Sequence, residues 1–143
     1  MSASNSASNN KALILDYFAT MNGGGSGRPI GDFFGADVVW HVPQSNPLIE
    51  PNPRRGHAAV MDLLGAGIGV YKEGSLQIDR QRIVADESQV GVQFTLTAQL
   101  ANGNPYVNQY FFLFSIADGR IDGVWEYLDT LYQANSGALD GAG

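Results

Sequence analysis

Hydrophobic residues between positions 11 and 21 recur at intervals of three and four, with Ile14, Phe18 and Met21 on one helical face. Because a run of glycines follows, the pattern predicts an amphipathic helix over residues 11–21. Residues 29–34 begin with a proline and precede a glycine, which indicates a short second helix.

A third helix is predicted to begin near Arg55 or Gly56. Its apolar positions repeat at helical spacing and are Val60, Leu63, Leu64 and Ile68. The segments with strand character are residues 37–42, 76–84, 89–100, 106–116 and 120–130. Helices followed by a run of strands predict an α+β domain, in which the helices lie on one face of a mainly antiparallel sheet.

The composition fits one globular domain, because the chain has 143 residues, of which 44% are hydrophobic and 15% charged. We expect a single domain over residues 11–133. Flexible tails are expected at residues 1–10 and 135–143, because their small and polar side chains bury little surface. No apolar stretch is long enough for a membrane helix and no export signal is visible, so we expect a cytoplasmic protein without a membrane partner.

The charged and chemically reactive residue types exclude several functions. Eight basic and fourteen acidic residues give a net charge of −6, and the basic residues are scattered, so nucleic acid is not an expected partner. The chain has no cysteine and only two histidines, which leaves no usual ligand set for a transition metal. We therefore expect neither a metal nor a cofactor, and we interpret Arg54 and Arg55 as a solvated pair.

Asn102-Gly103 is a strong signal for a two-residue hairpin loop, in which Ala101 pairs with Asn104. Counting back along both strands from this loop places Thr95 opposite Tyr110. By the same count Gln93 shares their face of the sheet, so this face is expected to combine polar groups with aromatic rings.

The next turn has two alternatives, a two-residue loop at residues 118–119 and a three-residue loop at residues 117–119. The three-residue loop places Glu126 opposite Tyr110. The other face of the sheet is then apolar and too large for a monomer to expose, so we expect a homodimer through it. This outer face is predicted to contain Phe94, Leu96, Val107, Phe111, Leu113, Trp125 and Tyr127.

A series of short motifs resembles the nuclear transport factor 2-like superfamily, in its SnoaL-like and ketosteroid-isomerase-like branch. The motifs are Trp40-His41-Val42-Pro43, Arg55-Gly56-His57, Tyr106-x-Asn108-x-Tyr110, Asp118-Gly119-Arg120-Ile121 and Glu126-Tyr127-Leu128-Asp129-Thr130. The resemblance covers about residues 11–133. It implies a cone, in which a strongly curved sheet wraps three N-terminal helices around a ligand cavity, and frequent dimerisation through the outer face.

The limonene epoxide hydrolase branch pairs an acid on the last strand with an Arg and an Asp two residues apart on an earlier strand. Glu126 matches this acid, but Gln93 and Thr95 stand at the Arg and Asp positions. Trp40 and Val42 stand where that branch has a Tyr and an Asn that hold the water. Epoxide hydrolysis by that mechanism is therefore disfavoured.

The ketosteroid isomerase branch has acids at positions that correspond to Val42 and Phe112 in this chain. Steroid isomerisation by that residue set is disfavoured too. Because the superfamily also includes dehydratases, cyclases and non-catalytic binding proteins, the resemblance leaves the function open.

Glu126 is the leading candidate for a catalytic acid or base, because burial in a cavity raises the pKa of a carboxyl. Tyr110 is the candidate donor to a substrate oxygen. For each, the alternative is a structural side chain whose polar group is satisfied within the protein. The candidate substrate-binding residues are Trp40, Val42, Gln93, Thr95, Asn108, Phe112 and Phe114.

The leading hypothesis is a cofactor-independent enzyme that transfers a proton on an apolar small molecule, as an isomerase, dehydratase or cyclase does. The alternatives are a non-catalytic small-molecule binding protein, a limonene-epoxide-hydrolase-like enzyme without the usual relay, and a dimeric module with a vestigial cavity. His41 is expected to point away from Trp40, and His57 is expected to have a local structural role.

Overall fold

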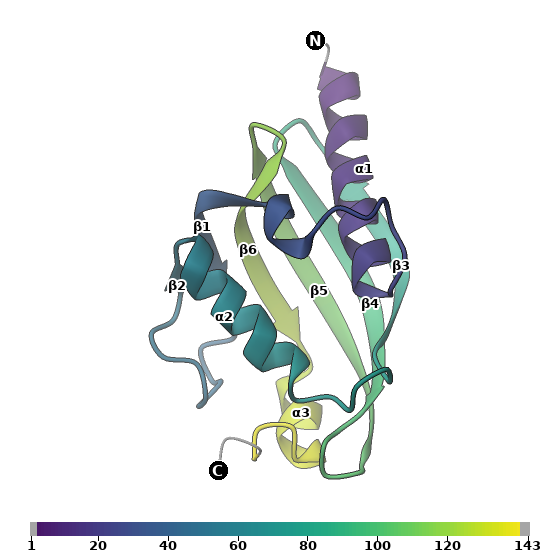
Figure 1. Ribbon diagram of the computed structural model, residues 1–143, viewed down its shortest axis with the longest axis vertical. Coiled ribbons are helices and arrows are strands. Elements are labelled where there is room, and N and C mark those ends of the chain that lie inside the picture. The colour runs from purple at the N-terminus through teal and green to yellow at the C-terminus, as the bar shows by residue number, and fades with distance from the viewer. Residues whose placement is uncertain (1–2, 141–143) are drawn as a thin grey trace.

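The computed structural model describes residues 3–140 of the chain (Figure 1). In chain order its elements are α1 (Ala3–Met21), the 3-10 helix η1 (Ile30–Phe33), β1 (Phe34–His41), β2 (Arg54–Arg55), α2 (His57–Ile68), β3 (Gln77–Ala85), β4 (Gln89–Gln99), β5 (Pro105–Ala117), β6 (Arg120–Leu128) and α3 (Thr130–Ser136). None of the helices within residues 3–140 is long and apolar enough to cross a membrane.

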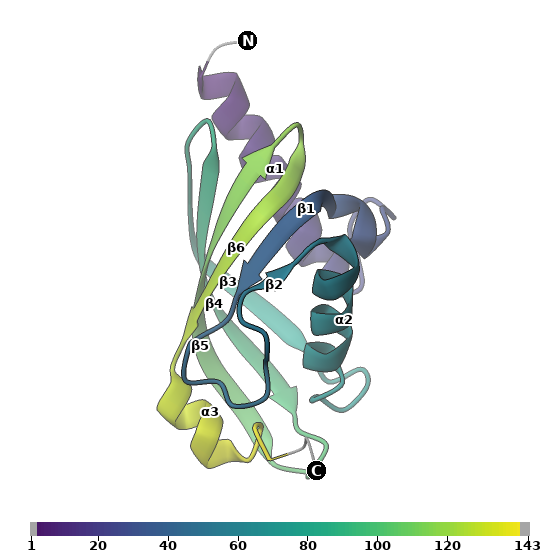
Figure 2. The same cartoon turned by 90° about the vertical axis from the view of Figure 1, so that its left-hand side faces the viewer.

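The six strands form one mixed sheet in the order β2-β1-β6-β5-β4-β3. Only the pair β1–β6 is parallel among the described strands, and the other neighbours are antiparallel. The helices α1 and α2 lie on one face, with α1 against β3 and β4 and α2 against β1 and β2 (Figures 1 and 2). The α+β class is therefore confirmed. The sheet is twisted and is not strongly curled, in place of the strongly curved cone that was expected.

Helix α1 begins at Ala3, eight residues before the predicted start. The segment expected to be an N-terminal tail is therefore helical from Ala3 onward. Asn10 is buried and donates from Nδ2 to the carbonyl of Asp86 at 3.1 Å, which attaches this part of the helix to the β3–β4 turn. At the other end, the amide of Asn22 donates to and accepts from the backbone of Ile78 at 2.9 and 2.8 Å.

Helix α3 follows β6 and was not predicted, because residues 120–130 were assigned to one strand and residues 135–143 to a tail. Its N-terminus is capped by Asp129, whose carboxylate accepts from the backbone N–H of Tyr132 at 3.0 Å. Its C-terminus is followed by Gly137 with φ of 90°, the left-handed conformation that commonly ends helices. The signal was present in the sequence as an Asp-Thr start and a glycine stop.

The β4–β5 hairpin differs from the prediction by one residue. The loop has three residues, since the Leu100 N–H donates to the Asn104 carbonyl at 2.8 Å and Gly103 has φ of 90°. Phe94, and not Thr95, is therefore paired with Tyr110. A shift of one residue moves every side chain of a strand to the other face of the sheet.

The β5–β6 hairpin also differs, and here the two-residue alternative is correct. Asp118 and Gly119 have φ of 53° and 73°. A type I′ turn requires a positive φ at both of its central residues. An irregularity between Ser115 and Ile116 then shifts the register further. Glu126 lies opposite Phe112 instead of Tyr110, but a displacement of two residues keeps it on the predicted face.

These registers change the membership of the outer sheet face. Phe94 and Leu96 are buried on the helix-covered side, so their assignment to the outer face was wrong. Val107, Phe111 and Tyr127 remain on the outer face, with 51%, 40% and 58% of their surface exposed. Leu113 and Trp125 are paired with each other on the same face and are partly buried.

Candidate functional site

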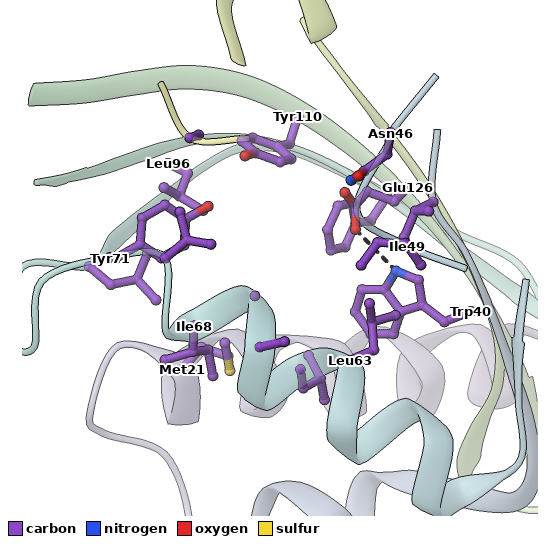
Figure 3. A pocket seen from close by; sticks show the side chains of 18 of the residues that line it. Met21, Trp40, Asn46, Ile49, Leu63, Ile68, Tyr71, Leu96, Tyr110 and Glu126 are labelled. Carbon is purple, nitrogen blue, oxygen red and sulfur yellow. Dashed lines mark hydrogen bonds between the residues drawn. The ribbon is translucent and has the colours of Figure 1, made fainter. Parts of the chain in front are cut away.

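A cavity of about 540 Å³ lies between the sheet and the two long helices. Figure 3 shows Tyr110 and Leu96 on the sheet side, with Met21 from α1 and Leu63 and Ile68 from α2 opposite. Most of the lining is aliphatic or aromatic. A cavity of this size and character suits a largely apolar small molecule.

Glu126 directs its carboxyl into the cavity beside Trp40 (Figure 3). Strand β1 pairs with β6 so that Trp40 lies next to Val124, two residues before Glu126 on the same face. The indole Nε1–H of Trp40 donates to Oε1 of Glu126 at 3.1 Å. This is the only hydrogen bond of the carboxyl to another described residue.

Burial raises the pKa of Glu126 from its ordinary value of 4.5 to about 7, because the apolar surroundings disfavour the charged form. The hydrogen bond from Trp40 acts in the opposite direction and stabilises the carboxylate. Near neutral pH the group is therefore present in both forms. A carboxyl in this range can both donate and accept a proton at physiological pH.

A network of tyrosine hydroxyls lies beside the cavity. The hydroxyls of Tyr106 and Tyr110 are 2.8 Å apart, and Asn108 donates from Nδ2 to the Tyr106 hydroxyl at 2.8 Å. Desolvation raises the pKa of Tyr110, and the neighbouring hydroxyls of Tyr71 and Tyr106 raise it further. Tyr110 is therefore held as a neutral hydroxyl that can donate a hydrogen bond.

Five of the predicted site residues line the cavity: Trp40, Val42, Tyr110, Phe112 and Glu126. Their convergence follows from the sheet, because the pair β1–β6 places the first strand of the chain next to the last. The structure therefore places these five residues at the cavity, while their catalytic and binding roles remain predictions.

The predicted placement of Gln93 and Thr95 in the cavity was wrong. The one-residue change of register turns both side chains to the outer face. There Gln93 accepts from Nη1 of Arg82 at 2.8 Å, and Thr95 accepts from Nε2 of Gln81 at 2.6 Å. Their partners come from the adjacent strand β3.

Asn108 and Phe114 face the helix-covered side but do not border the cavity among the residues described. Asn108 is buried, and its amide also donates to the carbonyl of Asp129 at 3.0 Å. Phe114 is fully buried and packs its ring against Tyr17 and Phe18. The expectation that these two residues bind substrate directly is therefore not supported by their positions.

Several lining residues were not identified from the sequence. Leu63 and Ile68 had a signal, since both belong to the apolar repeat of the third helix. Arg54 lines the cavity too, although it was interpreted as solvated, because β2 pairs it with Trp40. Asn46 comes from the proline-rich segment, where no periodicity indicates which side chains turn inward.

The two histidines are outside the cavity lining. His41 stacks on Trp125 with ring centroids 4.7 Å apart, so it points away from Trp40 as predicted. His57 contacts the backbone carbonyl of Gly31 through Nε2 at 2.8 Å, which is consistent with a structural role. Within residues 3–140, no group of three or more histidine or acidic side chains could hold a metal ion.

The fold and the cavity agree with the family to which the sequence can be assigned. Residues 14–124 match the model of the SnoaL-like domain, and the chain belongs to this family. No curated protein matches the chain significantly.

Many solved structures share the fold. An NTF2-like protein from Burkholderia xenovorans LB400 is 22% identical, with a TM-score of 0.68 over 91% of this chain and 96% of that chain. A protein from Jannaschia sp. CCS1, named as a SnoaL-like polyketide cyclase, is 14% identical, with a TM-score of 0.75 over 96% and 95%. TerC, co-crystallised with polyporic acid, is 18% identical, with a TM-score of 0.71 over 93% and 98%.

Proposed function

We propose that this chain is a cofactor-independent enzyme that transfers a proton on an apolar small molecule, in an isomerase, dehydratase or cyclase type of reaction. Glu126 is the acid or base, and Tyr110 donates a hydrogen bond to the substrate oxygen. Trp40, Val42 and Phe112 provide apolar contact. Similar structures named as a polyketide cyclase and co-crystallised with polyporic acid are consistent with small-molecule chemistry in this fold.

The observation that carries the proposal is the environment of the Glu126 carboxyl. It faces an apolar cavity, has one neutral hydrogen-bond donor, and has a pKa of about 7. A carboxyl that only supported the fold would be expected to have its oxygens satisfied by several protein donors. Among residues 3–140, no donor reaches the second carboxyl oxygen, which can therefore contact a bound molecule.

A general probe of base catalysis tests this without knowledge of the natural substrate. In 5-nitrobenzisoxazole, a base removes the proton on C3 while the N–O bond breaks, which gives a coloured nitrophenolate. The rate should rise with the ionised fraction of Glu126 and reach half its maximum near pH 7. Glu126→Gln should lower the rate by at least about 100-fold, whereas the exposed control Glu87→Gln should not change it. A Glu126→Gln variant with the wild-type rate would rule out the assigned base.

A non-catalytic binding protein is the second candidate. It is favoured because Trp40 is the only hydrogen-bond donor to Glu126 among the described residues, and no charged side chain or nucleophile is hydrogen-bonded to this carboxyl there. In that case 2-naphthamide, a neutral aromatic probe, should bind equally well to wild type and Glu126→Gln, and no base-dependent turnover should be found in either.

The epoxide hydrolase alternative is weakened by the register of β4. The residues of β4 that face the cavity are Phe94 and Leu96, which cannot replace the Arg and Asp of that relay. The polar residues Gln93 and Thr95 lie on the opposite face.

We also propose that the outer sheet face joins two copies of the chain. Val107, Phe111 and Tyr127 form the exposed part of this face, and Leu113 and Trp125 continue it. Two copies would remove this aromatic surface from water. The corrected patch is smaller than the predicted one, because Phe94 and Leu96 belong to the cavity side.

A further inference from the structure

Arg54 is the one cationic side chain among the described residues that line the cavity. It lies on the two-residue strand β2, directly opposite Trp40 on β1, so both side chains project from the same face of the sheet. Its neighbour Arg55 is paired with Val39, projects to the other face and is exposed. The two arginines are therefore a natural pair for comparison.

The Arg54 guanidinium has no protein partner in the part of the chain that the structure describes. Its Nε is buried without a hydrogen bond, although buried N–H groups in folded proteins are almost always paired. Asp62 from α2 lines the same cavity, yet no ion pair joins it to Arg54. A charge of this kind is stabilised when a complementary anion binds beside it.

The Arg54 guanidinium and the apolar remainder of the lining together indicate which kind of anion the cavity could bind. A guanidinium presents pairs of parallel N–H groups, which match the two oxygens of a carboxylate better than a single oxygen. Protein atoms cover Nε in the structure, so pairing through this edge requires the side chain to turn, whereas the terminal nitrogens are not covered in this way. The remaining lining is mostly apolar and accepts a hydrocarbon or aromatic body.

We propose that Arg54 is an anion-recognition residue of the cavity, and that the ligand is an apolar molecule that carries a carboxylate. The inference rests on the proposed function only in taking this cavity as the ligand site. It adds the substrate class, and it gives a role to a residue that the proton transfer does not use.

The test compares two probes of nearly the same shape, 2-naphthoate and 2-naphthamide, by fluorescence titration at pH 6. At this pH the naphthoate is ionised, while Glu126, with its pKa of about 7, is mostly neutral and does not repel it. Wild type should bind 2-naphthoate more tightly than 2-naphthamide. Arg54→Gln should weaken the binding of 2-naphthoate about tenfold and leave the affinity for 2-naphthamide unchanged.

Arg55→Gln is the matched control and should change neither affinity, because this side chain lies on the other face of β2. Asp62→Asn should bind 2-naphthoate at least as tightly as wild type, since the substitution removes from the cavity an acidic group that repels the carboxylate of the probe. If Arg54→Gln weakens both probes equally, or if wild type does not prefer the naphthoate, the inference is wrong. Neither result affects the role of Glu126, which is tested separately by the benzisoxazole reaction.

Discussion

Trp40 and Glu126 are 86 residues apart in the sequence, yet the indole N–H of one donates to the carboxyl of the other at 3.1 Å. The contact depends on the parallel pairing of β1 with β6, which brings the early Trp-His motif beside the final strand. The pKa of Glu126 therefore depends on the hydrogen bond from Trp40, an aromatic residue that lines the cavity. Several measurable effects should depend on this pair.

Trp40→Phe should raise the pKa of Glu126 above about 7. Trp40 stabilises the charged carboxyl, so loss of its N–H leaves only the desolvation that favours the neutral form. Loss of one hydrogen bond to a charged group corresponds to a pKa change of roughly one to two units. NMR titration of the side-chain carboxyl measures the change, and an unchanged or lower pKa in the variant would contradict this account.

The free energy of unfolding of Glu126→Gln, compared with that of wild type, should increase as the pH rises. The folded-state pKa of about 7 exceeds the ordinary value of 4.5, so the folded protein holds the proton more tightly than the unfolded chain. The stabilisation from the neutral carboxyl is complete below pH 4.5 and is lost as pH rises to about 7. Glutamine does not ionise, so the difference between the variants should grow over this interval, on the order of 1–3 kcal/mol.

Urea unfolding of both variants at several pH values measures this difference. Glu87→Gln, at an exposed turn position, serves as the control for the loss of one acidic group. A constant difference between wild type and Glu126→Gln from pH 4 to 8 would show that the carboxyl is not desolvated.

Phe111→Glu should convert a dimer into a monomer, because it places a charge in the centre of the exposed aromatic face. Phe111 is 40% exposed and is paired with Tyr127, which is 58% exposed. Leu131→Glu is a suitable control, since Leu131 is 70% exposed but lies on α3. Light scattering at micromolar concentration gives the mass of each, and a monomeric wild type would exclude the proposed interface.

Asn108→Ala should destabilise the fold by about 1–3 kcal/mol, because the hydroxyl of Tyr106 and the carbonyl of Asp129 both lose a donor. Its effect on binding of 2-naphthamide should be small, since Asn108 is buried and is not among the residues that line the cavity. Urea unfolding and fluorescence titration separate the two effects. A tenfold loss of affinity with unchanged stability would restore the sequence-based assignment of Asn108 to the binding surface.

The class of fold and the position of the acid could be predicted because they depend on long patterns. The helical repeat from Ile14 to Met21 and the run of four strands are consistent over many residues. Glu126 kept its predicted face although its register was wrong, because a displacement of two residues preserves the alternation of a strand.

The assignment of Gln93 and Thr95 to the cavity face was wrong because it relied on the Asn-Gly loop signal and not on the alternation of apolar and polar residues along β4. Asn-Gly fits a two-residue loop, but the same glycine also fits the last position of a three-residue loop. The alternation within β4 already indicated the correct face, since its apolar and polar residues occupy alternate positions. The apolar positions are Val90, Val92, Phe94 and Leu96, and the polar positions are Gln89, Gln93, Thr95 and Thr97.

The placement of Arg54 could not be predicted in the same way. Strand β2 has two residues, which is too short for a periodic pattern, and its direction is set by pairing with β1. The neighbouring prolines indicated only extended chain or turns. Such a side chain is located by tertiary structure alone.

The final strand occupies an inner position of the sheet, between β1 and β5. During synthesis, β1 and β2 can therefore pair with each other but cannot join the remaining strands until β6 has left the ribosome. Contacts between segments so distant in sequence form slowly, because a long loop must close first. The acid reaches the cavity in the same event that closes the sheet, so a partly made chain has neither a complete cavity wall nor the carboxyl. Ligand binding should accordingly appear only at the last step of folding.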